Sequence, residues 1–273
     1  MEVIELIKTI ILGIIQGITE WLPISSTGHM LLFNEFFALN VSDQFLKVFL
    51  VVIQLGSILA VIILYFYRLN PFATTKTISE RKETWSLWFK ILIASIPVAI
   101  VGLLFEDKID ALFYNNIMII AIALIVYGNL FIWMENSRKR NRVTSLKNLM
   151  IVDALIIGLF QTLALIPGTS RSGSTILGAT LIRTERKTAA EFSFFLAIPA
   201  MFGASVLKLV KYGLRFSQTE AVILATGFLV AFFVSILVIR LLLAYIRNHD
   251  FKIFGYYRIV LGIIILIYYY IIN

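Results

Sequence analysis

The sequence predicts an all-α polytopic membrane protein, with six transmembrane helices and two re-entrant helix pairs that form an inverted-topology repeat. Three observations support this prediction. First, 60% of the 273 residues are hydrophobic and only 15% are charged, a composition too apolar for a soluble globular domain. Second, several apolar runs approach the ~20 residues that span a bilayer. Third, two further apolar regions are each interrupted by a break rich in Pro, Gly, Ser and Thr.

Six apolar runs are the predicted spanning helices, and the whole chain, 1–273, is predicted to form a single integral-membrane domain. The runs cover residues 44–67, 86–105, 116–135, 187–210, 219–246 and 252–272. The two interrupted regions, about 3–38 and 148–183, have limbs that are too short to cross a bilayer comfortably. Irregular backbone at membrane depth needs partners inside the protein or a cavity, so a re-entrant hairpin fits each region better than two spans.

Loop charges predict the orientation of these elements. The loop 136–147 carries five Lys or Arg and no acid, and the loop 68–84 is also basic, so both are expected in the cytoplasm. The loop 106–115 has three acids against Lys108 and is expected outside, together with both chain termini. The first hairpin then enters from the outer side. Topology and anionic lipid headgroups account for the net charge of +8, so no nucleic-acid partner is expected.

An internal repeat is visible at an offset of 144 or 145 residues. The matching pairs are Gly13 with Gly158, Gln16 with Gln161, and Pro23 with Pro167. Each proline is followed by a serine-containing turn that ends in glycine. We expect repeat one at about 1–135 and repeat two at about 148–273. Folds of this type place their polar site near the bilayer midplane, where broken helices from the two repeats meet.

Polar side chains concentrate at the two breaks. Gln16 and Glu20 are four residues apart on one helix face, and His29 follows the first break. The hydroxyl residues are Ser25, Ser26 and Thr27 at the first break, and Ser170, Ser172, Ser174 and Thr175 around Arg171 at the second. Such groups are costly at membrane depth and mark candidate functional sites. Simpler roles stay open, because the hydroxyls can cap a helix and Glu20 can serve only as an ion-pair partner of Arg171.

Together the two breaks supply the groups needed to hydrolyse a phosphoanhydride. Arg171 and the N–H groups at a helix start suit phosphate oxygens, and Glu20, with or without a divalent metal, would neutralise charge. His29 or Ser26 would attack the phosphorus, or His29 would activate water. The alternative function is a transporter or flippase for a phosphorylated lipid or organic anion, since inverted repeats with discontinuous helices are a transporter architecture.

Four segments occur in order along nearly the whole chain. They are Glu-Trp-Leu-Pro-Ile-Ser-Ser-Thr-Gly-His (20–29), Val-Ile-Gln-Leu-Gly-Ser-Ile-Leu-Ala-Val (52–61), Pro-Gly-Thr-Ser-Arg-Ser-Gly-Ser-Thr (167–175) and Glu-Phe-Ser-Phe-Phe-Leu-Ala-Ile-Pro (191–199). They resemble the undecaprenyl-diphosphate phosphatase family of the bacitracin-resistance type. The resemblance implies removal of the terminal phosphate of undecaprenyl diphosphate, which recycles the lipid carrier for peptidoglycan and confers bacitracin resistance. It also implies a divalent cation, Mg²⁺ or Ca²⁺.

The resemblance places the catalytic residues at Glu20, Ser26, His29 and Arg171, with Glu20 also the metal ligand. We expect phosphate binding by Gln16, Ser25, Thr27, Ser170, Ser172, Ser174 and Thr175. Gln16 departs from the many members that have Glu there, which leaves a single carboxylate for the metal. The expected location is the bacterial plasma membrane, among its lipids, with the site open toward the outer side. The sequence leaves a homodimer open.

Overall fold

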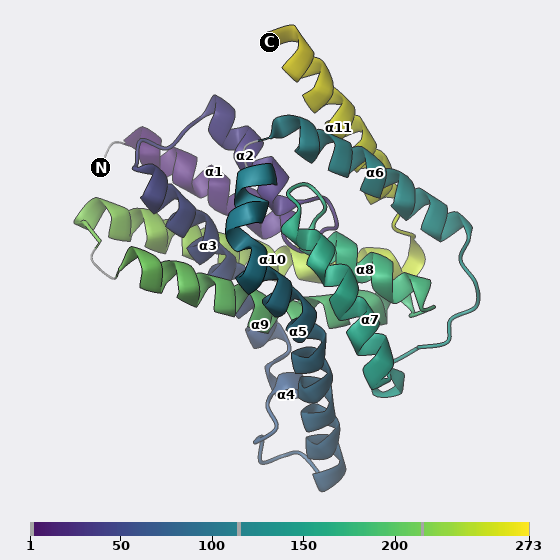
Figure 1. Ribbon diagram of the computed structural model, residues 1–273. Coiled ribbons are helices and arrows are strands. Elements are labelled where there is room, and N and C mark those ends of the chain that lie inside the picture. The colour runs from purple at the N-terminus through teal and green to yellow at the C-terminus, as the bar shows by residue number, and fades with distance from the viewer. Residues whose placement is uncertain (1–2, 114–115, 214–215, 273) are drawn as a thin grey trace.

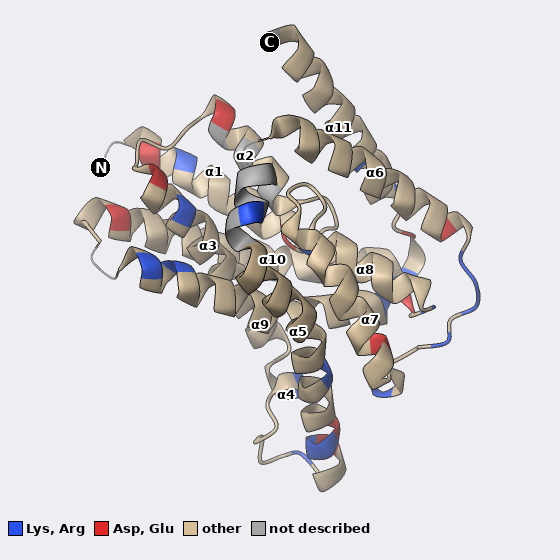
Figure 2. Cartoon of the chain, viewed as in Figure 1, with Lys and Arg blue, Asp and Glu red and all other residues tan. Residues whose placement is uncertain are grey.

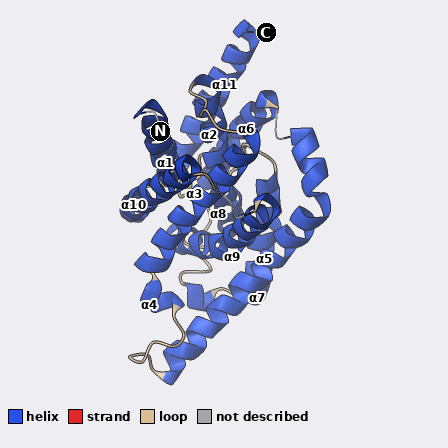
Figure 3. Ribbon diagram, turned by 90° about the vertical axis from the view of Figure 1, so that its left-hand side faces the viewer, coloured by secondary structure: helices blue, strands red, loops and turns tan. Residues whose placement is uncertain are grey.

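The computed structural model describes residues 3–113, 116–213 and 216–272, without the side chains of Thr27, Leu31, Asn34, 106–107, 109–113 and Ile272. The described chain folds as helices joined by loops (Figures 1 and 3). The α-helices are α1 (Val3–Thr19), α2 (Ser26–Phe36), α3 (Asp43–Leu64), α4 (Phe66–Leu69), α5 (Ile78–Phe113), α6 (Ile117–Asn136), α7 (Ile151–Thr162), α8 (Arg171–Leu181), α9 (Arg186–Tyr212), α10 (Gln218–Asn248) and α11 (Lys252–Ile272). Two short 3₁₀ helices, η1 (Leu146–Asn148) and η2 (Leu163–Leu165), flank α7.

Six of these helices are long and apolar enough to cross a membrane, namely α3, α5, α6, α9, α10 and α11. The prediction of six spanning helices in an all-α membrane protein is therefore confirmed. In each of the two interrupted regions, a first helix, α1 or α7, ends at an irregular break that leads into a short second helix, α2 or α8. Entry of these two pairs into the membrane from opposite sides stays a prediction.

Helix α5 is longer than the sequence predicts. It has 36 residues, which corresponds to ~54 Å of helix at 1.5 Å per residue. It begins ahead of the apolar run 86–105 and continues through most of the segment 106–115. The expectation of a loop over 106–113 is wrong, since this segment contains neither Gly nor Pro to end the helix. The polar first turns of α5 and the short helix α4 form a hairpin that projects from the bundle (Figure 1).

The two halves of the chain make corresponding contacts. Helix α1 packs on α10, and α7 packs on α5. In the predicted repeat, α1 corresponds to α7, and α10 corresponds to α5. The contact of α1 with α10 in one half therefore corresponds to the contact of α7 with α5 in the other. Helix α3 packs on its counterpart α9, and α6 packs on its counterpart α11. These contacts agree with the predicted repeat, whose two-fold relation stays a prediction.

Small residues allow the repeated contacts to be close. A Cβ added to Gly158 of α7 would lie 2.1 Å from the carbonyl oxygen of Ala94 in α5. We expect Gly158→Ala to lower stability by roughly 1–3 kcal/mol, because the helices must separate to admit the methyl group. Gly203→Ala is the matched control, since nothing lies within 4 Å of its added Cβ. Thermal unfolding in detergent measures both, and equal melting temperatures would contradict the close contact.

Charged residues are distributed unevenly over the bundle. Figure 2 shows basic residues along the connection between α6 and α7 and around the α4–α5 hairpin. These are the segments that loop charges predict in the cytoplasm. The centre of the bundle is formed by the first half of α9, where every residue from Thr188 to Ile198 is buried. This buried stretch lies beside the two breaks and contributes to the site described next.

Candidate active site

Each break ends in a serine with an unusual backbone conformation. Ser25 has φ 75° and Ser170 has φ 73°, and among the described residues only one other non-glycine residue has a positive φ. Each serine caps the helix that follows. Ser25 Oγ accepts from the N–H of Gly28 at 3.3 Å, and Ser170 Oγ accepts from the N–H of Gly173 at 3.1 Å. The capping role that the sequence left open is therefore present, in strained turns of the kind that concentrate at functional sites.

Glu20 connects the two breaks through its carboxylate. One oxygen, Oε1, accepts from Arg171 Nη2 at 2.8 Å. The other, Oε2, accepts from Gln16 Nε2 at 3.0 Å and from Ser26 Oγ at 2.9 Å. Glu20 is only 4% exposed, so this ion pair lies inside the protein. The ion pair of Arg171 with Glu20, which the sequence left open as a simpler role, is present. The spacing of Gln16 and Glu20 places both side chains in one hydrogen-bonded group.

Arg171 is held on several sides. Its Nη1 donates to the carbonyl oxygen of Ser193 at 2.8 Å and to the Ser193 hydroxyl at 3.3 Å. Its guanidinium carbon lies 5.6 Å from the centroid of the Trp21 ring, a cation–π contact. Trp21 is fully buried, so it forms a wall of the site and does not belong to an interfacial aromatic belt. The guanidinium therefore has a fixed direction.

Three buried polar atoms around this ion pair have no partner among the described residues: Gln16 Oε1, Trp21 Nε1 and Arg171 Nε. Buried polar groups in folded proteins nearly always have a protein or water partner. A cluster of unmet donors and one unmet acceptor next to a buried arginine indicates a place where a ligand or water completes the hydrogen bonds.

His29 occupies the first turn of α2, three residues after Ser26. Its Nδ1 lies 2.7 Å from the carbonyl oxygen of Ser25, and its Nε2 lies 2.7 Å from the hydroxyl of Tyr257 in α11. The carbonyl contact requires a proton on Nδ1, and in the neutral imidazole Nε2 is then the acceptor from Tyr257. Both ring nitrogens of His29 therefore have partners, which are Ser25 and Tyr257. Neither partner is Glu20.

The hydroxyls of the second break bond mainly within the protein. Ser172 Oγ donates to the carbonyl oxygen of Leu22 at 3.1 Å, and so ties the second break to the first. Ser174 Oγ contacts the Tyr127 hydroxyl at 3.4 Å, and Thr175 Oγ1 contacts Ser193 Oγ at 2.7 Å. These contacts give each hydroxyl a structural role, while their part in phosphate binding stays a prediction.

A second buried arginine, Arg258 of α11, binds backbone from both breaks. Its Nη1 donates to the carbonyl oxygen of Pro23 at 2.9 Å. Its Nη2 donates to the carbonyl oxygens of Gly168 at 2.7 Å and Thr169 at 3.0 Å. Arg258 is fully buried, and its guanidinium lies over the Tyr127 ring. It therefore acts as a clamp that fixes the two breaks relative to each other.

The chain matches the family described as bacitracin resistance protein BacA over residues 9–264. The chain belongs to this family. It is also 59% identical over 268 residues to the undecaprenyl-diphosphatase of Acetivibrio thermocellus, covering 97% of this chain and 98% of that protein. The undecaprenyl-diphosphatase 1 of Clostridioides difficile is 58% identical, with 98% of each chain covered. That of Enterococcus faecalis is 55% identical over 264 residues, with 95% of each chain covered.

In this member of the BacA family, the structure joins four of the residues predicted from the two breaks. Gln16, Glu20, Ser26 and Arg171 form one hydrogen-bonded cluster. The Thr27 side chain lies outside the described residues.

Gln161, the counterpart of Gln16 in the second half, is fully buried, and neither of its amide atoms has a partner among the described residues. It therefore does not join two helices through a hydrogen bond to a described residue.

Three residues of the site were missed by the sequence analysis: Ser193, Tyr257 and Arg258. Ser193 lies in a segment that carries the family resemblance, but its contact with Arg171 has no local signature. Arg258 had a readable signal, since it is an arginine within the apolar run 252–272 and a charge at such a place indicates function or a buried partner. Tyr257 is its neighbour and has no signal of its own.

The donor set around Glu20 fits a hard divalent cation in part. Mg²⁺ and Ca²⁺ prefer oxygen ligands, and Glu20 supplies carboxylate oxygens next to the unpartnered Gln16 Oε1. No group of three or more His, Cys, Asp or Glu that could hold a metal occurs among the described side chains. A cation here would need further oxygens from the ligand itself, so the protein residues that would hold it are Glu20 and Gln16.

Proposed function

We propose that the chain is an undecaprenyl-diphosphatase, which hydrolyses undecaprenyl diphosphate to undecaprenyl phosphate and inorganic phosphate. The full-length relatives carry this name, and membership of the BacA family fits lipid-carrier recycling and bacitracin resistance. The observation that carries the proposal is the Glu20 carboxylate, which bonds both the Ser26 hydroxyl and the Arg171 guanidinium. A nucleophile, a base and a phosphate-binding cation thus meet at one buried point.

The proposed reaction begins when the terminal phosphate binds Arg171 and takes the place of Glu20 at Nη2. The freed carboxylate accepts the proton of Ser26, whose Oγ forms a bond to the terminal phosphorus. The anhydride P–O bond breaks, and undecaprenyl phosphate leaves with the electron pair and receives the proton from Glu20. Arg171 and the N–H groups at the start of α8 stabilise the charge on the transferring phosphoryl group.

The second half of the reaction returns the enzyme to its starting state. Glu20 accepts a proton from a water molecule, and the resulting hydroxide attacks the phosphorus of phosphoserine 26. The Ser26 Oγ–P bond breaks, and Glu20 returns the proton to Ser26 as inorganic phosphate leaves. A divalent cation held by Glu20 and Gln16 would supply charge neutralisation to the diphosphate.

Ser26 is proposed as the nucleophile because its hydroxyl bonds a carboxylate at 2.9 Å, whereas His29 Nε2 is occupied by Tyr257. In a single-turnover reaction with terminally labelled undecaprenyl diphosphate, we expect label on Ser26 after an acid quench. Phosphoserine survives acid, and phosphohistidine does not. Two results would contradict this assignment. One is label on His29 that survives only an alkaline quench, and the other is label that passes directly to water.

Release of inorganic phosphate from undecaprenyl diphosphate by the purified chain tests the function itself. We expect release that depends on Mg²⁺ or Ca²⁺ and falls when Arg171 is replaced by alanine. If the folded protein releases no phosphate with either metal, the phosphatase proposal fails. A translocation assay with a phosphorylated lipid would then test the transporter alternative.

We also propose that the site opens toward the outer side of the bacterial plasma membrane. The chain has no cysteine, so single introduced cysteines report topology without background. In intact cells, a membrane-impermeant maleimide is expected to label Asn40→Cys in the α2–α3 connection and to leave Lys139→Cys unlabelled until the cells are opened. The reverse pattern would overturn the orientation derived from loop charges.

A further inference from the structure

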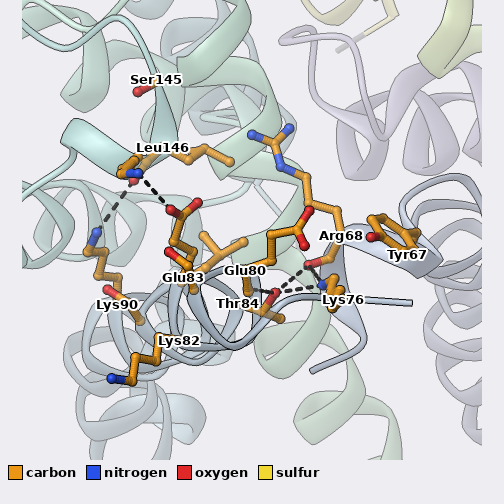
Figure 4. Close-up of a pocket in the computed structure, with 14 residues that line it drawn as sticks. Tyr67, Arg68, Lys76, Glu80, Lys82, Glu83, Thr84, Lys90, Ser145 and Leu146 are labelled. Carbon is orange, nitrogen blue, oxygen red and sulfur yellow. Dashed lines mark hydrogen bonds and ion pairs between the residues drawn. The ribbon is translucent and has the colours of Figure 1, made fainter. Parts of the chain in front are cut away.

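A pocket of about 640 Å³ lies at the base of the α4–α5 hairpin, apart from the two breaks. It is lined by the first turns of α5, by residues that follow α3, and by the connection before α7 (Figure 4). Its charged lining residues are Arg68, Lys76, Lys82, Lys90 and Lys147, with Glu80 and Glu83. The lining therefore carries an excess of three positive charges.

Several of these charges already have partners in the protein. The Lys76 ammonium is bonded to the carbonyl oxygens of Arg68 and Asn70 and to the Thr84 hydroxyl, so it organises the hairpin. Lys147 pairs with Glu83 at 2.6 Å. The Glu80 carboxylate accepts from the N–H and hydroxyl of Thr77 at the start of α5. Both acids of the pocket are thus occupied.

Lys90 is different, because it is buried and poorly satisfied. It is 8% exposed, yet its ammonium makes one hydrogen bond among the described residues, to the carbonyl oxygen of Leu146 at 3.4 Å. An ammonium has three donors, so Lys90 retains donors for another group. The carboxylate of Asp153 attracts it electrostatically, but that carboxylate is bonded to Arg142 and to the N–H of Met150.

Arg68 adds a second cation, whose guanidinium donates one hydrogen bond among the described residues. One of its guanidinium N–H groups bonds Glu191 at 2.7 Å, and its side chain is 43% exposed, which leaves part of the planar donor fork accessible. Lys90 and Arg68 lie toward opposite sides of the pocket in Figure 4. A phosphate group has several acceptor oxygens, so it can accept hydrogen bonds from donors on two sides of a pocket.

The surroundings of the pocket are typical of a site at the membrane surface. Trp85, next to the lining residue Thr84, is 54% exposed and packs edge-to-face on Phe72, which is 74% exposed. Exposed aromatic rings beside basic residues mark the headgroup level of a membrane. Basic pockets between helices on the cytoplasmic side can bind anionic lipid headgroups.

We propose that this pocket is a second anion site, which binds the phosphate of an anionic phospholipid headgroup through Lys90 and Arg68. The site is independent of the proposed phosphatase reaction, since none of its residues belongs to the Glu20 cluster. Bound lipid would hold the projecting α4–α5 hairpin and the α6–α7 connection on the membrane surface.

Lipid binding by the purified full chain tests this site. Native mass spectrometry would count phosphatidylglycerol and phosphatidylcholine bound to the wild type, Lys90→Gln and Lys139→Gln. We expect Lys90→Gln to weaken phosphatidylglycerol binding about tenfold, as for loss of a charge-assisted hydrogen bond. Lys139→Gln removes the same charge from an exposed position in the α6–α7 connection, and we expect no change. Equal losses in both variants, or none in either, would overturn the proposal.

Two further arms keep the result interpretable. The first arm adds inorganic phosphate at millimolar concentration to the lipid-bound chain. If the phosphate displaces the lipid, the phosphate group alone is recognised. If the lipid stays bound, the rest of the lipid is needed for binding. A photoactivatable phosphatidylglycerol on the wild-type chain is expected to crosslink to segments 79–90 and 145–147. This measurement does not depend on the folding of a variant, and crosslinks without enrichment at these segments would contradict the site.

Discussion

Replacing Glu20 with glutamine is expected to lower kcat/KM for undecaprenyl diphosphate by about a thousandfold or more. The substitution removes the proposed proton acceptor for Ser26, which is worth ~10²–10⁴ in rate. It also removes the carboxylate that holds Arg171 at 2.8 Å. Phosphate release under single-turnover and steady-state conditions measures the loss, which should lie mainly in kcat because the amide can still occupy the same space.

The matched control for Glu20 is Glu35→Gln. Glu35 is exposed at the far end of α2, so its substitution makes the same change of charge in the same hairpin. We expect near wild-type activity for Glu35→Gln and unchanged helical content for both variants. A Glu20→Gln protein that is folded and retains more than a tenth of the activity would exclude Glu20 as the proton acceptor.

Replacing Arg258 with glutamine is the second change with a large expected effect. Arg258 donates three hydrogen bonds to carbonyl oxygens of Pro23, Gly168 and Thr169. The shorter, neutral side chain leaves buried acceptors unpaired, at a cost of about 1–3 kcal/mol for each unsatisfied group. We expect a lower melting temperature, together with a loss of kcat because the two breaks are no longer fixed relative to each other.

Two variants separate a clamp from a general loss of stability. Arg240→Gln on α10 removes an exposed arginine and should leave both stability and activity unchanged. Arg258→Lys keeps the charge but has no planar fork to bridge two segments, so it should fold better than Arg258→Gln and still react slowly. Full activity in Arg258→Lys would show that the charge alone suffices and that bridging is not required.

That Glu20 and Arg171 belong to the candidate site could be predicted from the sequence around each residue. A carboxylate and a guanidinium in apolar surroundings must find partners, and each stands at a break that the Pro, Ser and Gly pattern marks. The same pattern at an offset of 145 residues explains why Ser25 and Ser170 adopt the same positive φ and cap their helices in the same way.

Other features depend on tertiary contacts that no local pattern carries. Tyr257 and Ser193 become part of the site only because α11 and α9 pass beside the breaks. The length of α5 was underestimated because hydropathy marks the apolar part of a helix and not its polar ends. Arg258 is an intermediate case, in which the buried charge was visible but its three backbone partners were not.

The most direct test of the central claim, that the two breaks form one catalytic site, is a double-mutant cycle between Glu20 of the first break and Arg171 of the second. It compares kcat/KM for Glu20→Gln, Arg171→Gln and the double variant. Residues that act as a unit show strongly non-additive losses, so the double variant is predicted to be little slower than the slower single variant. Losses that multiply would contradict a shared site, because they would show that Glu20 and Arg171 act independently of each other.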